Sequence, residues 1–83
     1  MATTEKRNLS DIAREIKAIW SRIGNGVSPY AKPYLDAMME LDSVDQAYYA
    51  EDGRTQVRYF LSNAQSFRGA DAKRLKAELK ALL

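Results

Sequence analysis

The clearest structural pattern of the chain lies at residues 9–23, LSDIAREIKAIWSRI. Its apolar residues recur at intervals of three or four, at Leu9, Ile12, Ala13, Ile16, Ile19, Trp20 and Ile23. This spacing places them on one face of an α-helix. Asn8 or Ser10 is a candidate cap at the start, and the run 24–26 (GNG) supplies left-handed positions that end a helix. The stretch therefore predicts a helix that buries one side.

A second apolar stripe follows the first at Tyr34, Ala37, Met38 and Leu41. Ser28-Pro29 before it resembles an N-cap followed by proline at the first helical position. Pro33 would remove a backbone hydrogen bond from a helix that began there. Two alternatives follow: either the first turn is irregular, or the regular helix begins at Pro33.

The segment after this helix contains Ser43 followed three residues later by Gln46, which is the capping-box pattern. It predicts a short helix that starts there and runs through Tyr48 and Tyr49 to Asp52-Gly53.

Helical spacing returns in the last third of the chain. One stripe comprises Val57, Phe60, Leu61, Ala64 and Phe67, and the last comprises Ala72, Leu75, Leu79 and Leu82. The break between the two helices falls at Ser62-Asn63, Ser66 or Gly69, with Asp71 a candidate cap for the final helix.

These patterns predict an all-α fold, a compact small bundle of about four amphipathic helices. We expect a flexible N-terminal tail at 1–7 and a single helical domain at 8–83. A chain of 83 residues has room for one core, which buries only a little over ~60% of the surface of the unfolded chain.

The composition argues against most catalytic designs. The chain has no cysteine and no histidine, which excludes thiol nucleophiles and removes the usual general base and the commonest metal ligand. Asp36, Glu40 and Asp42 carry oxygen ligands, but Asp42–Asp45 lacks the glycine and terminal glutamate of a calcium loop. We therefore expect a non-enzymatic protein with no cofactor, no catalytic residue and no metal site. An enzyme that uses carboxylates with magnesium is a distant third hypothesis.

The first residues are polar, and no apolar run is long enough for a signal peptide or a membrane span. The expectation is a soluble, cytoplasmic protein with no membrane partner.

Charge is divided into three blocks along the chain. Residues 36–52 carry six carboxylates and no lysine or arginine, whereas the segments before and after them have net charges of +3 and +5. One-signed blocks steer partners or dock one part of a fold on another. We expect the acidic block to neutralise the basic final helices, within the fold or across a dimer contact.

The basic C-terminal region offers one candidate surface, for phosphate groups of a nucleic acid. Its members are Arg68, Lys73, Arg74, Lys76 and Lys80. The structural interpretation is favoured here, because cations near a helix C-terminus complement its dipole and Arg74 is spaced to pair with Glu78.

The adjacent aromatic pairs Tyr48-Tyr49 and Tyr59-Phe60 offer another candidate surface. Two neighbouring rings on a helix lie about 100° apart, so both cannot face one narrow core. Phe60 belongs to the apolar stripe, which leaves Tyr59 beside Arg58 as a candidate interface anchor. The alternative, held as equal, is that Tyr59 covers the edge of the core and keeps its hydroxyl in water.

Four segments resemble small uncharacterised proteins encoded by tailed phages of actinobacteria. They are Pro33–Met38, Tyr59–Ala64, Phe67–Gly69 and Lys73–Leu79. The resemblance covers most of the chain from Leu9 onward. It implies a protein made in the bacterial cytoplasm that binds a host or phage macromolecule, and it carries no activity or catalytic residue.

The hypothesis from the sequence is a helical module that binds a host or phage protein, or a second copy of itself, through Tyr59, Arg58, Tyr48 and Tyr49. The alternative is a nucleic-acid-binding accessory protein that uses the basic C-terminal helix.

Overall fold

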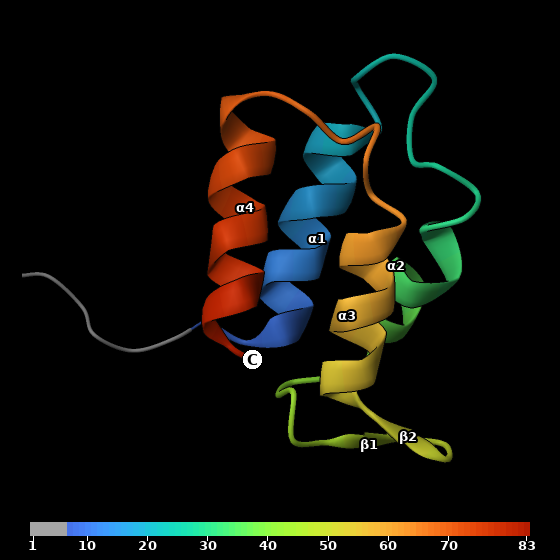
Figure 1. Ribbon diagram of the computed structural model, residues 1–83, viewed down its shortest axis with the longest axis vertical. Helices are drawn as coiled ribbons and strands as arrows, with labels where there is room; N and C mark the ends of the chain where they lie inside the picture. Colours follow the sequence, from blue (N-terminus) through green and yellow to red (C-terminus); the bar gives the residue numbers. More distant parts are fainter. Residues whose placement is uncertain (1–6) are drawn as a thin grey trace, which may run out of the picture.

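The computed structural model describes residues 7–83 and contains four helices and a two-stranded hairpin (Figure 1). The elements in order are α1 (Leu9–Trp20), α2 (Lys32–Met39), β1 (Ala47–Tyr48), β2 (Glu51–Asp52), α3 (Gly53–Ser62) and α4 (Ala70–Ala81). The fold is mostly helical, as predicted, but the hairpin means that it is not purely all-α. Apart from Arg7, the predicted tail lies outside the described residues.

Helix α1 confirms the first prediction, because its apolar stripe from Leu9 to Trp20 is buried except at Ile19, which is partly buried. Asn8 is the N-cap, although its side chain makes no capping hydrogen bond. The helix ends at Trp20, three residues before the last apolar position of the stripe. Gly24 and Gly26 follow with φ of 53° and 84°, the left-handed values that the glycines were expected to supply.

Helix α2 combines both alternatives for Pro33. Ser28 begins an irregular turn, in which its carbonyl accepts from the amides of Ala31 and Lys32. The regular helix then begins at Lys32, one residue before Pro33. Proline is tolerated in this first turn because its amide position has no partner within the helix.

The prediction of a helix from Ser43 to Gly53 is wrong. The segment forms a turn and then the antiparallel hairpin β1–β2, in which Tyr48 pairs with Glu51. The capping-box residues act in the turn instead. Ser43 Oγ accepts from the amide of Asp45 at 2.9 Å, and Gln46 Oε1 accepts from the amide of Asp42 at 2.8 Å.

The third helix is shorter than its apolar stripe indicates. Helix α3 ends at Ser62, yet Ala64 and Phe67 beyond it are fully buried. Asn63 Nδ2 donates to the carbonyl of Tyr59 at 2.8 Å, so a side chain occupies an acceptor in the last turn. The connection to α4 thus supplies core residues without being helical.

Helix α4 begins after Gly69, whose φ of 110° favours glycine. Gly69 is the N-cap, so the expectation that Asp71 caps this helix is wrong. Asp71 lies in the first turn and pairs with Arg74.

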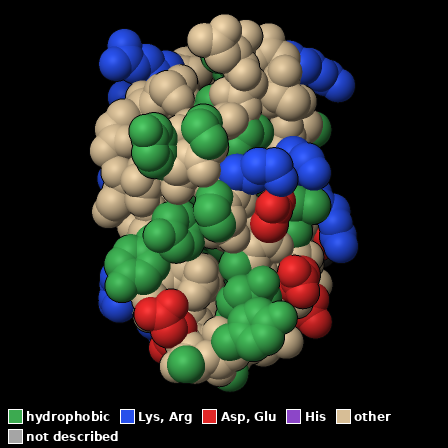
Figure 2. Space-filling model, turned by 90° about the vertical axis from the view of Figure 1, so that its right-hand side faces the viewer, with side chains coloured by type: hydrophobic (Ala, Val, Ile, Leu, Met, Phe, Trp, Pro, Cys, Tyr) green, Lys and Arg blue, Asp and Glu red, His purple; other side chains and the backbone are tan. Residues whose placement is uncertain are grey.

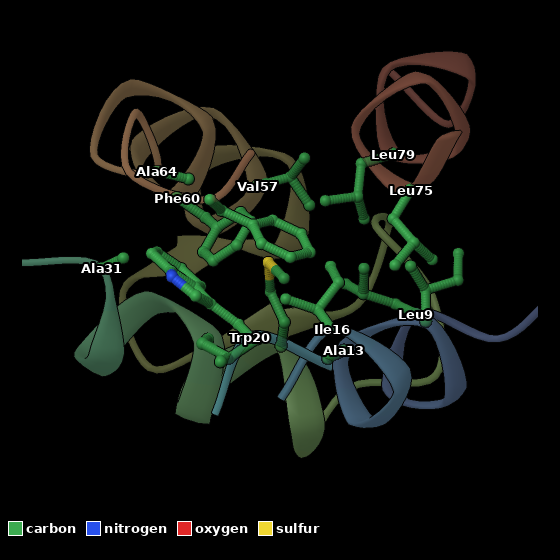
Figure 3. Packing of buried hydrophobic residues seen from close by; sticks show 14 of the residues in the cluster. Leu9, Ala13, Ile16, Trp20, Ala31, Val57, Phe60, Ala64, Leu75 and Leu79 are labelled. Carbon is green, nitrogen blue, oxygen red and sulfur yellow. The ribbon is translucent and has the colours of Figure 1, made fainter. Parts of the chain in front are cut away.

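The core lies between the helices and includes residues of all four. Helix α2 packs against α1 and α3, and α4 packs against α1. Trp20 stacks on Phe67 with ring centroids 5.0 Å apart, and Phe60 meets it edge-on at 6.0 Å. Figure 3 shows Trp20, Phe60 and Leu79 pointing from α1, α3 and α4 into this interior.

Candidate interaction surfaces

Backbone hydrogen bonds join the start of α3 to the turn that precedes the hairpin. Gly53 donates to the carbonyl of Gln46 at 2.9 Å, and Arg54 donates to the carbonyl of Val44 at 3.0 Å. Asp52 completes the cap by accepting from the Thr55 amide at 3.0 Å. Hydrogen bonds from the Thr55 amide and hydroxyl hold the pKa of the Asp52 carboxyl below its ordinary value. These bonds hold the hairpin next to the start of α3.

Four tyrosines gather on the side of the molecule formed by α2, α3 and the hairpin. Tyr34 on α2 and Tyr59 on α3 have ring centroids 5.3 Å apart. Tyr48 and Tyr49 on the hairpin meet edge-on at 4.7 Å. We call these four residues and Pro33 the tyrosine surface. Figure 2 shows the face that carries α2 and the hairpin, where hydrophobic and acidic side chains lie together.

A shallow groove lies within the tyrosine surface. It is lined by Pro33, Tyr34, Tyr48, Tyr49, Ala50, Glu51 and Gln56. Tyr59 does not line the groove but packs against Tyr34, which does. Tyr59 itself is 43% exposed to solvent. Tyr59 thus packs on another ring and still presents surface to solvent, and its role as an interface anchor stays a prediction.

Tyr49 combines an exposed ring with a strained, left-handed backbone. It is 89% exposed and has a φ of 58°, the one positive value of a residue other than glycine among the described residues. It occupies the tight turn between β1 and β2, where glycine or asparagine is the usual residue. A left-handed backbone costs a bulky residue about 1 kcal/mol or more. The chain therefore has an exposed ring at a position where a smaller residue is more stable.

Carboxylates flank the tyrosine surface. Glu51 lines the groove, and Glu40 Oε2 accepts from the Tyr48 hydroxyl at 3.5 Å. Partial burial of the Tyr48 phenol and the charge of Glu40 raise its pKa above the ordinary value. Within residues 7–83, neither glutamate takes part in an ion pair. The part of the surface that carries Glu40 and Glu51 is consequently negative.

The nucleic-acid candidates divide into two sets. Arg68, Lys73 and Lys76 line one depression before and along α4, and Lys80 follows one turn after Lys76. We call these four the basic surface. Lys76 has a structural role as well, since its ammonium donates to the carbonyls of Ala64 and Phe67 at 2.8 and 2.7 Å. Burial, together with the charges of Lys80 and Arg68, lowers the Lys76 pKa.

Arg74 points to α1 and is not part of the basic surface. It donates to Glu15 at 2.8 Å and to Asp71 at 3.2 Å, so the expected pair with Glu78 is wrong. Glu78 instead accepts from Arg7, which also contacts Glu15 at 2.7 Å. Hydrogen bonds from Arg74 and Arg7 lower the Glu15 pKa, and a bond from Arg7 lowers the Glu78 pKa. This network joins α1 to α4.

The expectation that the acidic block neutralises the basic final helices holds for one pair: within residues 7–83 it is ion-paired with α3 through Asp45 and Arg54, and it makes no ion pair with α4. Its ion pairs are Asp36 with Lys32 at 2.9 Å and Asp45 with Arg54. No other ion pair of residues 7–83 involves it. The acidic hairpin end and the basic side of α4 thus keep separate surfaces.

The structure brings three of the predicted interface residues together, Tyr48, Tyr49 and Tyr59. Arg58 is exposed on α3, and its charge helps to stabilise the carboxylate of Asp52. The sequence assigned Tyr34 to the core stripe and so missed its place in the surface, together with Glu51 in the groove. Asp52 is a residue type favoured at N-caps, and that interpretation places the start of α3 after it and excludes a helix through the hairpin.

Comparison with protein families, curated proteins and solved structures finds no match to this chain. None of the described helices has the length and apolarity needed to cross a membrane. Residues 7–83 also contain no group of three or more acidic side chains placed to hold a metal ion.

Proposed function

We propose that this protein is a non-enzymatic binding module of phage type that recognises a host or phage protein, or a second copy of itself, through the tyrosine surface. Tyr59, Tyr48 and Tyr49 are the anchors, Tyr34 supports them, and Arg58 lies at the edge. Tyrosine and arginine are typical of interface hot spots, since they combine a large apolar area with a polar end.

The observation that carries this proposal is Tyr49. Its side chain is 89% exposed and its backbone is left-handed. Neither feature benefits the isolated domain beyond the ring contact with Tyr48. Strained residues often occur at binding sites, where the cost is offset when a ligand covers them. A partner that buries the ring gives both features a reason.

The test compares Tyr49→Asn with the unaltered chain in affinity capture from a bacterial host lysate and in sedimentation of the purified protein. Asparagine suits the left-handed turn, so we expect the free energy of unfolding to stay equal or rise by up to about 1 kcal/mol. Capture of the partner, or self-association, is expected to weaken at least about tenfold, the effect of losing a modest hot spot.

Tyr30→Ala is the matched control, because Tyr30 is a tyrosine that is 76% exposed and lies outside the groove. It should leave binding unchanged. Unaltered capture by Tyr49→Asn, with a folded circular dichroism spectrum, would refute the proposal. Tyr59→Ala should also weaken binding while the helices persist.

A second candidate function is nucleic-acid binding through the basic surface. The observation in its favour is that, within residues 7–83, none of its four cations takes part in an ion pair. If phosphate contacts carry this function, affinity falls steeply as salt rises. The double variant Lys73→Gln/Lys80→Gln should abolish a low-salt gel shift that Arg22→Gln preserves. No shift of the unaltered chain at low salt would end this candidate.

A further inference from the structure

We propose that the groove of the tyrosine surface receives an arginine side chain of the partner protein. The inference rests on the proposed function and adds the chemistry of the partner. Two features of the groove, its aromatic walls and its charge, support it.

The walls suit a flat cation. Tyr34, Tyr48 and Tyr49 line the groove, and the rings of Tyr48 and Tyr49 stand at 82° to each other. A guanidinium group is attracted to the face of an aromatic ring within about 6 Å of its centroid. Perpendicular rings present one face and one edge, so an arginine that enters between α2 and the hairpin can stack on one ring and contact the other.

The charge of the groove complements the same group. Glu51 lines the groove, and Glu40 contacts the hydroxyl of Tyr48 at its edge. In the described part of the chain, neither carboxylate is neutralised by an ion pair. A guanidinium can donate two parallel hydrogen bonds to a carboxylate, which an ammonium cannot match. An acidic or phosphate-bearing partner would be repelled here.

The experiment titrates the isotope-labelled full chain with the peptide acetyl-Gly-Arg-Gly-amide and follows backbone amide shifts by NMR. The matched probe replaces arginine by citrulline, which has the same shape and no charge. We expect saturable shifts at Tyr34, Tyr48, Tyr49 and Glu51 in millimolar arginine peptide, and none with the citrulline peptide. Glu51→Gln should weaken the arginine peptide about tenfold, as loss of a charge-assisted hydrogen bond requires.

Asp42→Asn is the control variant, because it removes one charge of the same acidic block outside the groove. It should change the affinity for the arginine peptide by less than about twofold, because a distant charge is screened by the solvent and salt. Equal effects of the two variants, equal binding of the citrulline peptide, or no saturable shift in the groove would each overturn the inference. If Tyr49→Asn still weakens partner capture in that case, the proposed function stands without the arginine. If Tyr49→Asn leaves partner capture unchanged, the proposed function fails as well.

Discussion

Gly53 is a position where the absence of a side chain is required by packing. A Cβ there would lie 2.8 Å from Val44 Cα and 2.9 Å from the Ser43 carbonyl, at the point where α3 meets the preceding turn. Both neighbours are backbone atoms and cannot move aside by rotation. We expect Gly53→Ala to lower the free energy of unfolding by about 1 to 3 kcal/mol, as overpacking does. Urea denaturation measures the change.

Gly24 is the matched control for this prediction. Its φ is 53°, and nothing lies within 4 Å of the point that a Cβ would occupy. Gly24→Asn should be close to neutral, since asparagine tolerates a left-handed backbone. An unchanged urea midpoint for Gly53→Ala would show that the turn at Ser43 shifts freely.

Lys76 shows how a residue of the basic surface also stabilises the domain. Its ammonium donates to the carbonyls of Ala64 and Phe67 in the connection before α4. Lys76→Met keeps the length of the side chain but removes the donors, and we expect a loss of about 1 to 3 kcal/mol in the free energy of unfolding. Lys73 is an exposed neighbour on the same helix, and Lys73→Met should leave the free energy of unfolding unchanged. Equal stability of the two variants would contradict the assigned role.

At the scale of elements, the ion-pair network between α1 and α4 predicts an acid-side dependence of stability. The Glu15 pKa and the Glu78 pKa both lie below the ordinary value of 4.5 in the folded protein. The unfolded chain therefore takes up protons first as the pH falls. The stabilisation is present above pH 4.5 and is lost as the pH drops through the folded values.

The variant that tests this is Arg74→Gln, which removes the first hydrogen-bond partner of Glu15. We expect chemical unfolding across the acidic range to show a weaker pH dependence than in the unaltered chain. Arg22→Gln removes the same charge from an exposed position outside the network and should keep the full dependence. A steeper acid-side loss in Arg74→Gln would be incompatible with the network.

The sequence predicted helices where the signal is local and failed where distant contacts decide. The stripes of α1 and α4 follow one helical period and match the structure. The hairpin was missed because Ser43 and Gln46 hydrogen-bond in a turn that α3 holds in place through Gly53 and Arg54. The sequence left the end of α3 open among Ser62-Asn63, Ser66 and Gly69, because Phe67 keeps the helical period. The structure ends the helix at Ser62, the first of these, and Phe67 reaches the core from a loop.

Phe67 lies in the loop between α3 and α4, yet we expect it to contribute strongly to the stability of the whole domain. It is fully buried and stacks on Trp20, so it joins the loop to α1. Phe67→Ala should cost about 3 to 5 kcal/mol, a large share of the roughly 5 to 15 kcal/mol that stabilises an ordinary domain. Circular dichroism during heating should show a much lower melting temperature.

Leu61→Ala is the comparison for this change, because Leu61 is half-buried at the edge of the same core. Its melting temperature should fall much less. Equal melting temperatures of the two variants would show that the stack of Phe67 on Trp20 does not make the expected contribution to stability.

Three residues of the tyrosine surface could be predicted from the sequence, but the assembled surface could not. Tyr59, Tyr48 and Tyr49 were identified by their adjacency to other aromatics or to arginine, which is visible in the chain. Their assembly around Tyr34 depends on the packing of α2 on α3 and on the hairpin, which no local pattern encodes. The charge blocks were visible too, but the sequence does not show which basic residues the acidic block meets: Asp45 pairs with Arg54 of α3, and within residues 7–83 no ion pair joins the block to α4.

The burial of Trp20 gives the molecule two independent optical signals. The only tryptophan is 1% exposed inside the core, whereas all five tyrosines are at least partly exposed. Tryptophan emission therefore reports the integrity of the fold, and tyrosine absorbance reports changes at the surface. A ligand that perturbs the second signal and not the first binds the folded domain without loosening it, so one unlabelled sample distinguishes recognition from unfolding.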